Sequence, residues 1–175
     1  MGMSEYMKSI RNKVGHSLLQ MPSVTIINFD DEGRVLLLKH RDTNLWVAPG
    51  GAIEPGESPA DSAKREMWEE TGLVVELVDI IGVYGGRDFV VEYSNGDQTS
   101  YVMTIFEGRT IGGELKPIDD ESIEFGYFTY EESSALEMQP WLKVVLPDIL
   151  VNKGRKRTLF QTSSWKPEDE TDKLS

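Results

Sequence analysis

The residues best suited to chemistry lie between positions 50 and 73 and are mostly acidic. Glu66, Glu69 and Glu70 stand at helical spacing, and in a helix their carboxylates fall within an arc of about 100°. Like charges this close repel each other by roughly 0.2–0.5 kcal/mol per exposed pair. Because Mg²⁺ prefers oxygen ligands such as carboxylates, the spacing indicates a metal site. A solvated acidic helix face is the simpler alternative for these three residues alone.

The loop before the three glutamates favours the metal site. Gly50, Gly51 and Gly56 allow the backbone to approach a ligand closely. Glu57 adds a fourth carboxylate directly before the helix, and Arg65 lies among the acids as an ion-pair partner. The combination of a glycine-rich loop with four acids therefore favours a metal site over a solvated acidic helix face.

A helix over residues 58–71 must position these side chains. Ser58 suits the N-cap, Pro59 suits the first helical position, and Asp61 places a negative charge where it complements the helix dipole. Gly72 is a natural C-terminal cap in the left-handed conformation. A narrow apolar stripe beside the carboxylates can press the helix onto a sheet, and it consists of Ala60, Ala63 and Met67.

The flanking segments predict the architecture that carries this helix. Further helices are expected over residues 5–20 and 140–151. Asn95-Gly96 is a strong tight-turn signal. Apolar and β-branched runs predict strands over 24–29, 35–38, 73–83, 89–93, 100–107 and 123–129. The first two of these strands are a candidate hairpin, and strands on both sides of a central helix predict an α/β sandwich with a mixed sheet.

The predicted organisation is one domain with an extension at each end. Residues 1–21 form a helical extension, which is interpreted as a packing helix or a homodimer contact. Residues 22–152 form the domain that contains the acidic segment. Residues 153–175 form a polar tail with a basic cluster at its start, and this tail is interpreted as solvated.

Bulk composition excludes several classes of function. A net charge of −12 makes the chain a poor partner for nucleic acid, whose phosphates need Lys and Arg. An acidic protein that handles phosphates needs a local positive charge, and a metal ion supplies one. The chain has no cysteines, which excludes thiolate nucleophiles and Cys-ligated zinc. With no apolar run near ~20 residues and no signal-peptide pattern, we expect a soluble, cytoplasmic protein without a membrane partner.

The acidic segment resembles the motif of the Nudix hydrolases, a family that includes MutT-like proteins. In that motif a Gly is followed by five residues and a Glu, and seven residues later by Arg-Glu, an aliphatic residue, any residue, Glu-Glu, any residue, Gly and an aliphatic residue. Gly51, Glu57 and the run from Arg65 to Leu73 match every fixed position. Trp46 to Gly50 is also similar to the family, and the resemblance covers about residues 22–150.

The resemblance implies a fold and a metal. A Nudix-type α/β/α sandwich is expected, in which Glu66, Glu69 and Glu70 hold one or more Mg²⁺ ions, with Mn²⁺ as an alternative. By the same resemblance Glu57 ligates or supports the metal, the Gly51 carbonyl contributes to it, and the catalytic Arg65 orients one of the glutamates.

The resemblance leaves the general base and the substrate contacts open. Glu69 is the first candidate for the base that takes the proton from the attacking water. Glu121, in an acidic loop before the strand at 123–129, is the second. Substrate contacts are expected from Arg41 and Arg87 toward phosphate or ribose, and from aromatic rings toward a base. The candidate rings are Trp46, Tyr84 and Tyr101, each of which is also a natural core residue.

Three functions fit the pattern. The first is hydrolysis of a phosphoanhydride bond in a small nucleotide-type substrate, such as an ADP-ribose-like compound, a dinucleoside polyphosphate or a nucleoside triphosphate. The second is a non-catalytic metabolite sensor of the same fold, against which the intact set of acids argues. The third is isomerisation of isoprenoid diphosphates. That chemistry resembles cases that need a catalytic cysteine, and this chain has none. Nothing in the sequence selects the substrate, because specificity depends on loops outside the motif.

Overall fold

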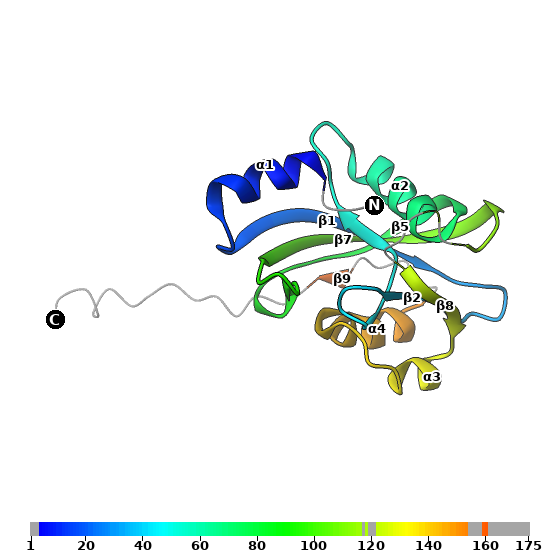
Figure 1. Cartoon of the computed structure of the whole chain (residues 1–175). Helices are drawn as coiled ribbons and strands as arrows, with labels where there is room; N and C mark the ends of the chain where they lie inside the picture. The colour runs from blue at the N-terminus through cyan, green and yellow to red at the C-terminus, as the bar shows by residue number, and fades with distance from the viewer. Residues whose placement is uncertain (1–3, 117, 119–121, 154–158, 161–175) are drawn as a thin grey trace, which may run out of the picture.

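The computed structural model describes residues 4–116, 118, 122–153 and 159–160. Figure 1 shows helices above and below a central sheet. In chain order the elements are α1 (Glu5–Val14), β1 (Leu19–Asn28), β2 (Val35–His40), β3 (Trp46–Val47), β4 (Gly50–Ala52), α2 (Pro59–Thr71), β5 (Leu73–Tyr84), the 3₁₀ turn η1 (Arg87–Phe89), β6 (Val90–Glu92), β7 (Gln98–Gly113), β8 (Ser122–Phe128), α3 (Tyr130–Ser134), α4 (Pro140–Val151) and β9 (Leu159–Phe160).

A mixed sheet of six strands forms the centre of the molecule. Its strand order is β4-β1-β7-β5-β9, and β6 pairs with β7. β1 and β7 run parallel, from Leu19 beside Thr99 to Asn28 beside Gly108. β4 is antiparallel to β1, and β5 is antiparallel to β7. The long β1–β7 pair is thus the axis on which the other strands are built.

A smaller antiparallel sheet, in the order β3-β2-β8, lies beside the first. The predicted hairpin of the first two strands is therefore wrong, because β1 and β2 belong to different sheets and meet in a single bridge between Phe29 and Val35. The physical reason is that β1 already has β4 on one side and β7 on the other. After the turn at 30–33 the chain must leave the larger sheet.

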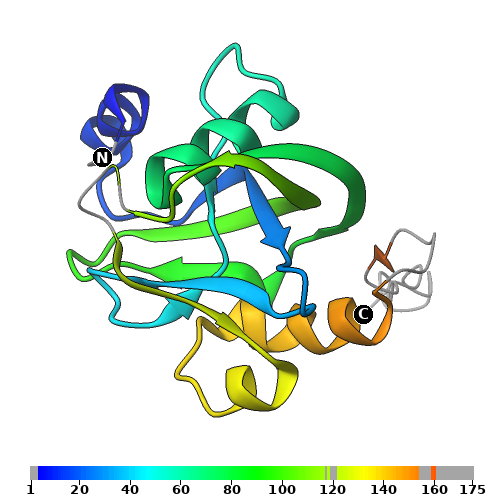
Figure 2. The same cartoon turned by 90° about the vertical axis from the view of Figure 1, so that its right-hand side faces the viewer.

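Two helices cover opposite faces of the larger sheet (Figure 2). Neighbouring strand residues point to opposite faces. Ile26 belongs to the apolar cluster that includes Ala63 and Met67 of α2, whereas Ile27 belongs to the cluster that includes Leu142 of α4. The predicted α/β architecture with a mixed sheet and covering helices is confirmed.

Helix α2 begins and ends at the predicted caps. The Ser58 side chain accepts a hydrogen bond from the Asp61 amide, and Pro59 occupies the first helical position. Gly72 has φ 72° and donates its amide to the Trp68 carbonyl, which is the left-handed termination that glycine allows. The caps fix where α2 stops, and therefore which way its acids face.

The N-terminal segment differs from the prediction. The expected helix over 5–20 ends at Val14, and Gly15 caps it with φ 62°. β1 then begins at Leu19, inside the predicted 1–21 extension, and Pro22 lies within the strand. The predicted helix rested on the helical spacing of Met7, Ile10, Val14 and Leu18, but only Met7 and Arg11 of α1 are buried. The apolar spacing continued past Gly15 because strand residues followed it directly.

The C-terminal helix α4 has both of its predicted ends. The segment read as a solvated polar tail contributes a short strand, because Leu159 and Phe160 pair in parallel with Gly82 and Val83 of β5. Residues 154–158 and 161–175 lie outside the described residues. Within the described ranges no helix is both long and apolar enough to cross a membrane.

A buried asparagine joins the two sheets and gives a stability prediction. Asn28 is fully buried, and its amide donates to the Gly108 carbonyl at 2.9 Å and to the Thr110 hydroxyl at 3.0 Å. The Tyr127 hydroxyl of β8 donates to its oxygen at 3.0 Å. We expect Asn28→Ala to lower the free energy of unfolding by about 2–3 kcal/mol, since it leaves buried groups unpaired.

Urea denaturation measures this loss, and Tyr127→Phe provides the matched comparison. That variant removes one hydrogen bond and keeps the ring, so about 1 kcal/mol is expected. Neutral surface substitutions change the free energy of unfolding by roughly 0.5 kcal/mol or less. If the free energy of unfolding of Asn28→Ala differs from that of the wild type by no more than this, the network does not join the sheets.

Candidate active site

The acids of α2 lie against strand β4. The Gly50 amide donates to Oε2 of Glu70 at 2.8 Å, and Glu70 is only 5% exposed. A Cβ added to Gly51 would lie 2.6 Å from the carboxyl carbon of Glu66. A larger residue at position 51 would therefore displace the Glu66 carboxylate from the strand. Glu70 ties the helix to the strand, and Glu66 lies directly against the strand backbone.

Arg65 is the centre of the acidic cluster. Its Nε and Nη2 donate to the two carboxylate oxygens of Glu57 at 2.7 and 2.9 Å. Its Nη1 donates to Glu66 at 2.7 Å and to Glu69 at 3.0 Å. All four side chains are partly shielded from solvent. Three carboxylates thus converge on one guanidinium. Its planar arrangement of N–H groups matches the two oxygens of Glu57, so that pair is bidentate.

This pairing favours the charged forms of Glu57 and Arg65. The pKa of Glu57 is lowered to about 2, because Arg65 donates hydrogen bonds to the charged form, while burial acts in the opposite direction. The pKa of Arg65 is raised, first by its hydrogen bond to Glu57 and further by Glu66 and Glu69. Glu57 therefore stays ionised at any pH at which the protein functions.

The carboxylates lie close together, but their described positions are not those of ligands around one cation. Within the described ranges, no three acidic or imidazole groups are already arranged to hold a metal ion. The space between Glu57, Glu66 and Glu69 is occupied by the Arg65 guanidinium. Glu57, Glu66 and Glu69 therefore lie within one neighbourhood, as oxygen ligands of a cation would.

Glu121, the second candidate for the base, lies outside the described residues. Its placement therefore stays a prediction. Described residues of the preceding loop follow the end of α2: the Lys116 amide donates to the Thr71 carbonyl at 2.9 Å, and the Ile118 amide donates to the Glu69 carbonyl at 3.2 Å. The loop thus passes the helix at the level of Glu69.

The predicted aromatic contacts belong to the core. Trp46 is buried and packs edge-to-face against Phe128, with ring centroids 4.9 Å apart. Tyr84 is buried and stacks on Phe89, and its hydroxyl has no hydrogen-bond partner among the described residues. Burial of both rings argues against the predicted stacking of either on a substrate base. Their apolar surface is used to join the sheets and α4.

The two predicted arginine contacts are exposed and separate. Arg41 follows β2 in a turn, whereas Arg87 begins η1, which packs against α4. Since α4 lies across the sheet from α2 (Figure 2), the structure does not bring Arg87 to the acidic cluster. A substrate role for either arginine stays a prediction.

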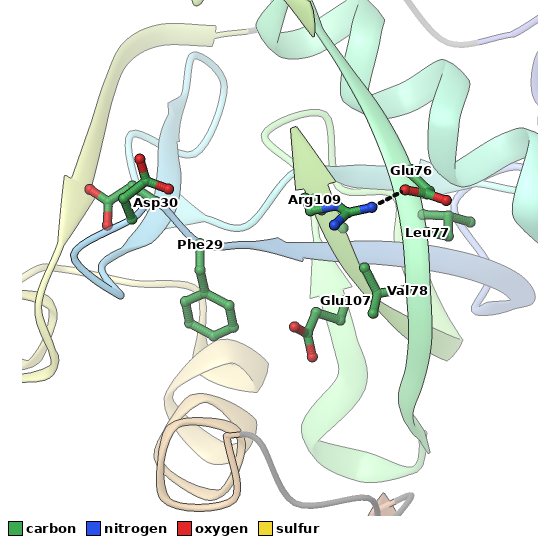
Figure 3. A pocket seen from close by; sticks show the side chains of 9 residues that line it. Phe29, Asp30, Glu76, Leu77, Val78, Glu107 and Arg109 are labelled. Atoms are coloured by element: carbon green, nitrogen blue, oxygen red, sulfur yellow. Dashed lines mark hydrogen bonds and ion pairs between the residues drawn. The ribbon is translucent and has the colours of Figure 1, made fainter. Parts of the chain in front are cut away.

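A groove of about 490 Å³ lies away from these acids (Figure 3). The residues that follow β1 and the interiors of β5 and β7 line it, and Phe29, Val78 and Glu107 are among its residues. Arg109 and Glu76 form an exposed ion pair on its wall. No residue of the acidic cluster lines this groove. The sequence carried no signal for it, because its residues come from three separate segments.

The fold and the clustered acids define a Nudix-type hydrolase. The model of the NUDIX domain matches residues 19–149. This chain belongs to the Nudix family. The match begins at the first residue of β1 and leaves α1 outside it.

Individual relatives agree with this family. A MutT-like protein of Streptomyces ambofaciens is 39% identical over 116 residues, which cover 66% of this chain and 68% of the relative. An ADP-ribose pyrophosphatase of Methanocaldococcus jannaschii is 34% identical over 95 residues, and the match spans only about half of each chain, 52%. The fold is similar to that of the MutT protein from Methanosarcina mazei Go1, with a TM-score of 0.65, 23% identity and coverage of 80% of this chain and 99% of the other.

The Glu57–Arg65 pair gives a pH prediction. A folded-state pKa of about 2 against an ordinary value of 4.5 means that the stabilisation is complete above pH 4.5 and is lost as the pH falls toward 2. Glu57→Gln should therefore lower the free energy of unfolding by about 1 kcal/mol at pH 7. The difference from the wild type should shrink below pH 4.5 and vanish near pH 2.

Thermal unfolding of both proteins across this pH range measures the effect. Glu76→Gln, at an exposed ion pair, serves as the control and should change stability little at any pH. A Glu57→Gln deficit that persists unchanged at pH 2 would show that the pair with Arg65 is not its cause.

Proposed function

We propose that this protein hydrolyses a phosphoanhydride bond in a nucleoside diphosphate-linked compound and needs Mg²⁺ to do so. The observation that carries the proposal is the convergence of Glu57, Glu66 and Glu69 on one cationic group beside the Gly51 backbone. A cluster built only for stability would not need three acids for one arginine. The excess negative charge fits a divalent cation.

The donor set suits a hard cation. Glu57, Glu66 and Glu69 supply anionic oxygens within one neighbourhood, as Mg²⁺ requires. Gly51 has no side chain to separate its backbone from Glu66. When bound, Mg²⁺ would neutralise charge on the diphosphate oxygens and make a water molecule more acidic. Mn²⁺ has similar ligand preferences and is a reasonable substitute.

The protein's own groups then have separate roles. Glu69, held at 3.0 Å by Arg65, is the candidate that accepts the proton from the attacking water. Arg65 orients this carboxylate and lowers the pKa of Glu57. Glu70 fixes the distance between α2 and β4 through the Gly50 amide. Glu121 is the alternative base.

The substrate class follows from the site and from the relatives together. Closely placed acids around a cation suit neighbouring phosphates, because one cation can contact two of them. The ADP-ribose pyrophosphatase relative is named for cleaving such a linkage. We infer that the substrate is a small nucleotide-type compound with at least two linked phosphates.

Loss of the metal or of Glu69 should abolish turnover. We expect EDTA to stop hydrolysis, and Glu69→Gln to lower kcat by about 100-fold or more if Glu69 acts as base or ligand. Steady-state kinetics with Mg²⁺ provide the measurement, and circular dichroism checks that the variant is folded. Glu76→Gln, outside the cluster, should retain wild-type kinetics. Full activity in Glu69→Gln would rule out its role.

The bond that is cleaved gives a separate test. We expect ADP-ribose-like compounds, dinucleoside polyphosphates or nucleoside triphosphates to be cut at a phosphoanhydride, with ¹⁸O from labelled water entering a phosphate of the product. Phosphomonoesters such as AMP should be inert, because they offer only one phosphate. Mass spectrometry of the products decides the matter. Release of phosphate from AMP, with every anhydride inert, contradicts the proposal, and metal-dependent binding without turnover favours the non-catalytic alternative.

A further inference from the structure

The groove of Figure 3 opens on the face of the larger sheet that α4 covers. Phe29 lines it and packs against the apolar cluster that contains Leu142 of α4. Phe106 belongs to the apolar cluster under α2, so the next residue of β7, Glu107, points to the α4 face. Val78 of β5 also lines the groove and is 55% exposed. Among the described residues, α4 therefore leaves this part of the sheet face uncovered.

The chain leaves α4 at the rim of this groove. Lys153 follows the helix, and its Nζ lies 4.0 Å from the centroid of the Phe29 ring. The same Nζ donates to the Gly33 carbonyl at 3.3 Å. A cation over an aromatic ring is attracted by the negative face of that ring. Lys153 thus places the start of residues 154–158 beside Phe29.

The chain is described again on the opposite side of the groove. β9 pairs with the outer edge of β5, whereas Phe29 directly follows β1. In the sheet order, β7 and β5 lie between these two points. An extended chain covers at most about 3.6 Å per residue, which gives about 22 Å for the six steps from Lys153 to Leu159. Residues 154–158 are therefore too few to take a path far from the groove.

The groove and this segment carry opposite charges. Residues 154–158 read Gly-Arg-Lys-Arg-Thr, with three cations and no acid. The groove lining contains four carboxylates and one guanidinium, which belong to Asp30, Asp31, Glu76, Glu107 and Arg109. Asp30 is paired with Arg34, and Glu76 is paired with Arg109. The described part of the chain gives no ion pair to Asp31 or Glu107, so both leave negative charge at the groove.

We propose that the groove is the docking site of residues 154–158 of the same chain, and that Asp31 and Glu107 attract the cations of this segment. The segment then joins the end of α4 to the outer edge of β5 across the sheet face. Its basic residues serve an internal contact, which suits a chain whose net charge of −12 disfavours binding of nucleic acid. The inference does not depend on the proposed function, because no residue of the acidic cluster lines the groove.

Limited proteolysis tests the docking in the full chain. Trypsin cleaves after Arg and Lys, so the segment itself contains the cleavage sites. When opening is fast, the cleavage rate reports how often these sites leave the groove. Asp31→Asn combined with Glu107→Gln removes the attraction without altering the sites. We expect cleavage within 154–158 to become about fivefold faster, as the loss of two exposed ion pairs predicts. Mass spectrometry of the fragments measures each site.

Two controls exclude general effects of charge and stability. Glu124→Gln combined with Glu131→Gln removes the same number of charges from exposed positions outside the groove, and cleavage should stay at the wild-type rate. Within each protein, cleavage after Lys173 provides a reference at a site beyond the segment, and it should respond to neither pair of substitutions. Circular dichroism checks that every variant is folded.

Cross-linking provides a second measurement that does not depend on access of a protease. The chain has no cysteine, so Val78→Cys with Lys156→Cys introduces a single reactive pair. We expect a short bismaleimide to join the two within one chain. The reaction should slow by about twofold or more when Asp31→Asn and Glu107→Gln are added, because the docked population falls.

Three results overturn the docking within one chain. The first is an equal rate of cleavage, or of cross-linking, with and without Asp31→Asn and Glu107→Gln. The second is protection from trypsin that increases with protein concentration, which assigns the groove to a second copy of the chain. The third is protection that appears only when an oligonucleotide is added, which assigns the basic segment to nucleic acid.

Discussion

The structure depends on one constraint: three carboxylates must stay together although they repel each other. Arg65 satisfies it by donating to Glu57, Glu66 and Glu69 at once. Its charge cancels only part of theirs, and the cluster keeps a net negative charge in a partly shielded place. A neutral arrangement would be more stable and would have no reason to attract a cation. The residual charge is therefore the feature that connects the fold to the metal-dependent reaction proposed for it.

The elements around this cluster serve to hold α2 at a fixed distance from β4. The apolar side of α2, with Ala63 and Met67, packs on the sheet, and caps fix both helix ends. On the polar side Glu70 accepts the Gly50 amide. This bond explains why one of four similar acids is almost fully buried. Packing sets the depth of the helix and Glu70 sets its rotation, so the remaining three acids have little freedom to separate.

Sequence reasoning succeeded where the signal was local. The caps at Ser58 and Gly72, and both ends of α4, follow from short patterns that act within one turn. It could not foresee burial that depends on neighbours far along the chain. Trp46 and Tyr84 were candidate substrate contacts, but the sheets and α4 bury both rings. No local pattern states which face of a strand another element will cover.

The N-terminal helix shows the same limit. The helical spacing predicts that Met7 is buried and gives no reason to expect the same of Arg11, because a charged side chain on a helix is normally exposed. Arg11 is buried here because the β6–β7 hairpin, more than 80 residues away, supplies the Asp97 carboxylate, the Gln98 carbonyl and the Thr99 hydroxyl. Burying a charged group is costly unless it is paired and hydrogen-bonded, and the partners on β7 are in place only when the hairpin is folded. The cost of burying this charge therefore couples the folding of α1 to that of the hairpin, a dependence that no pattern within the helix could indicate.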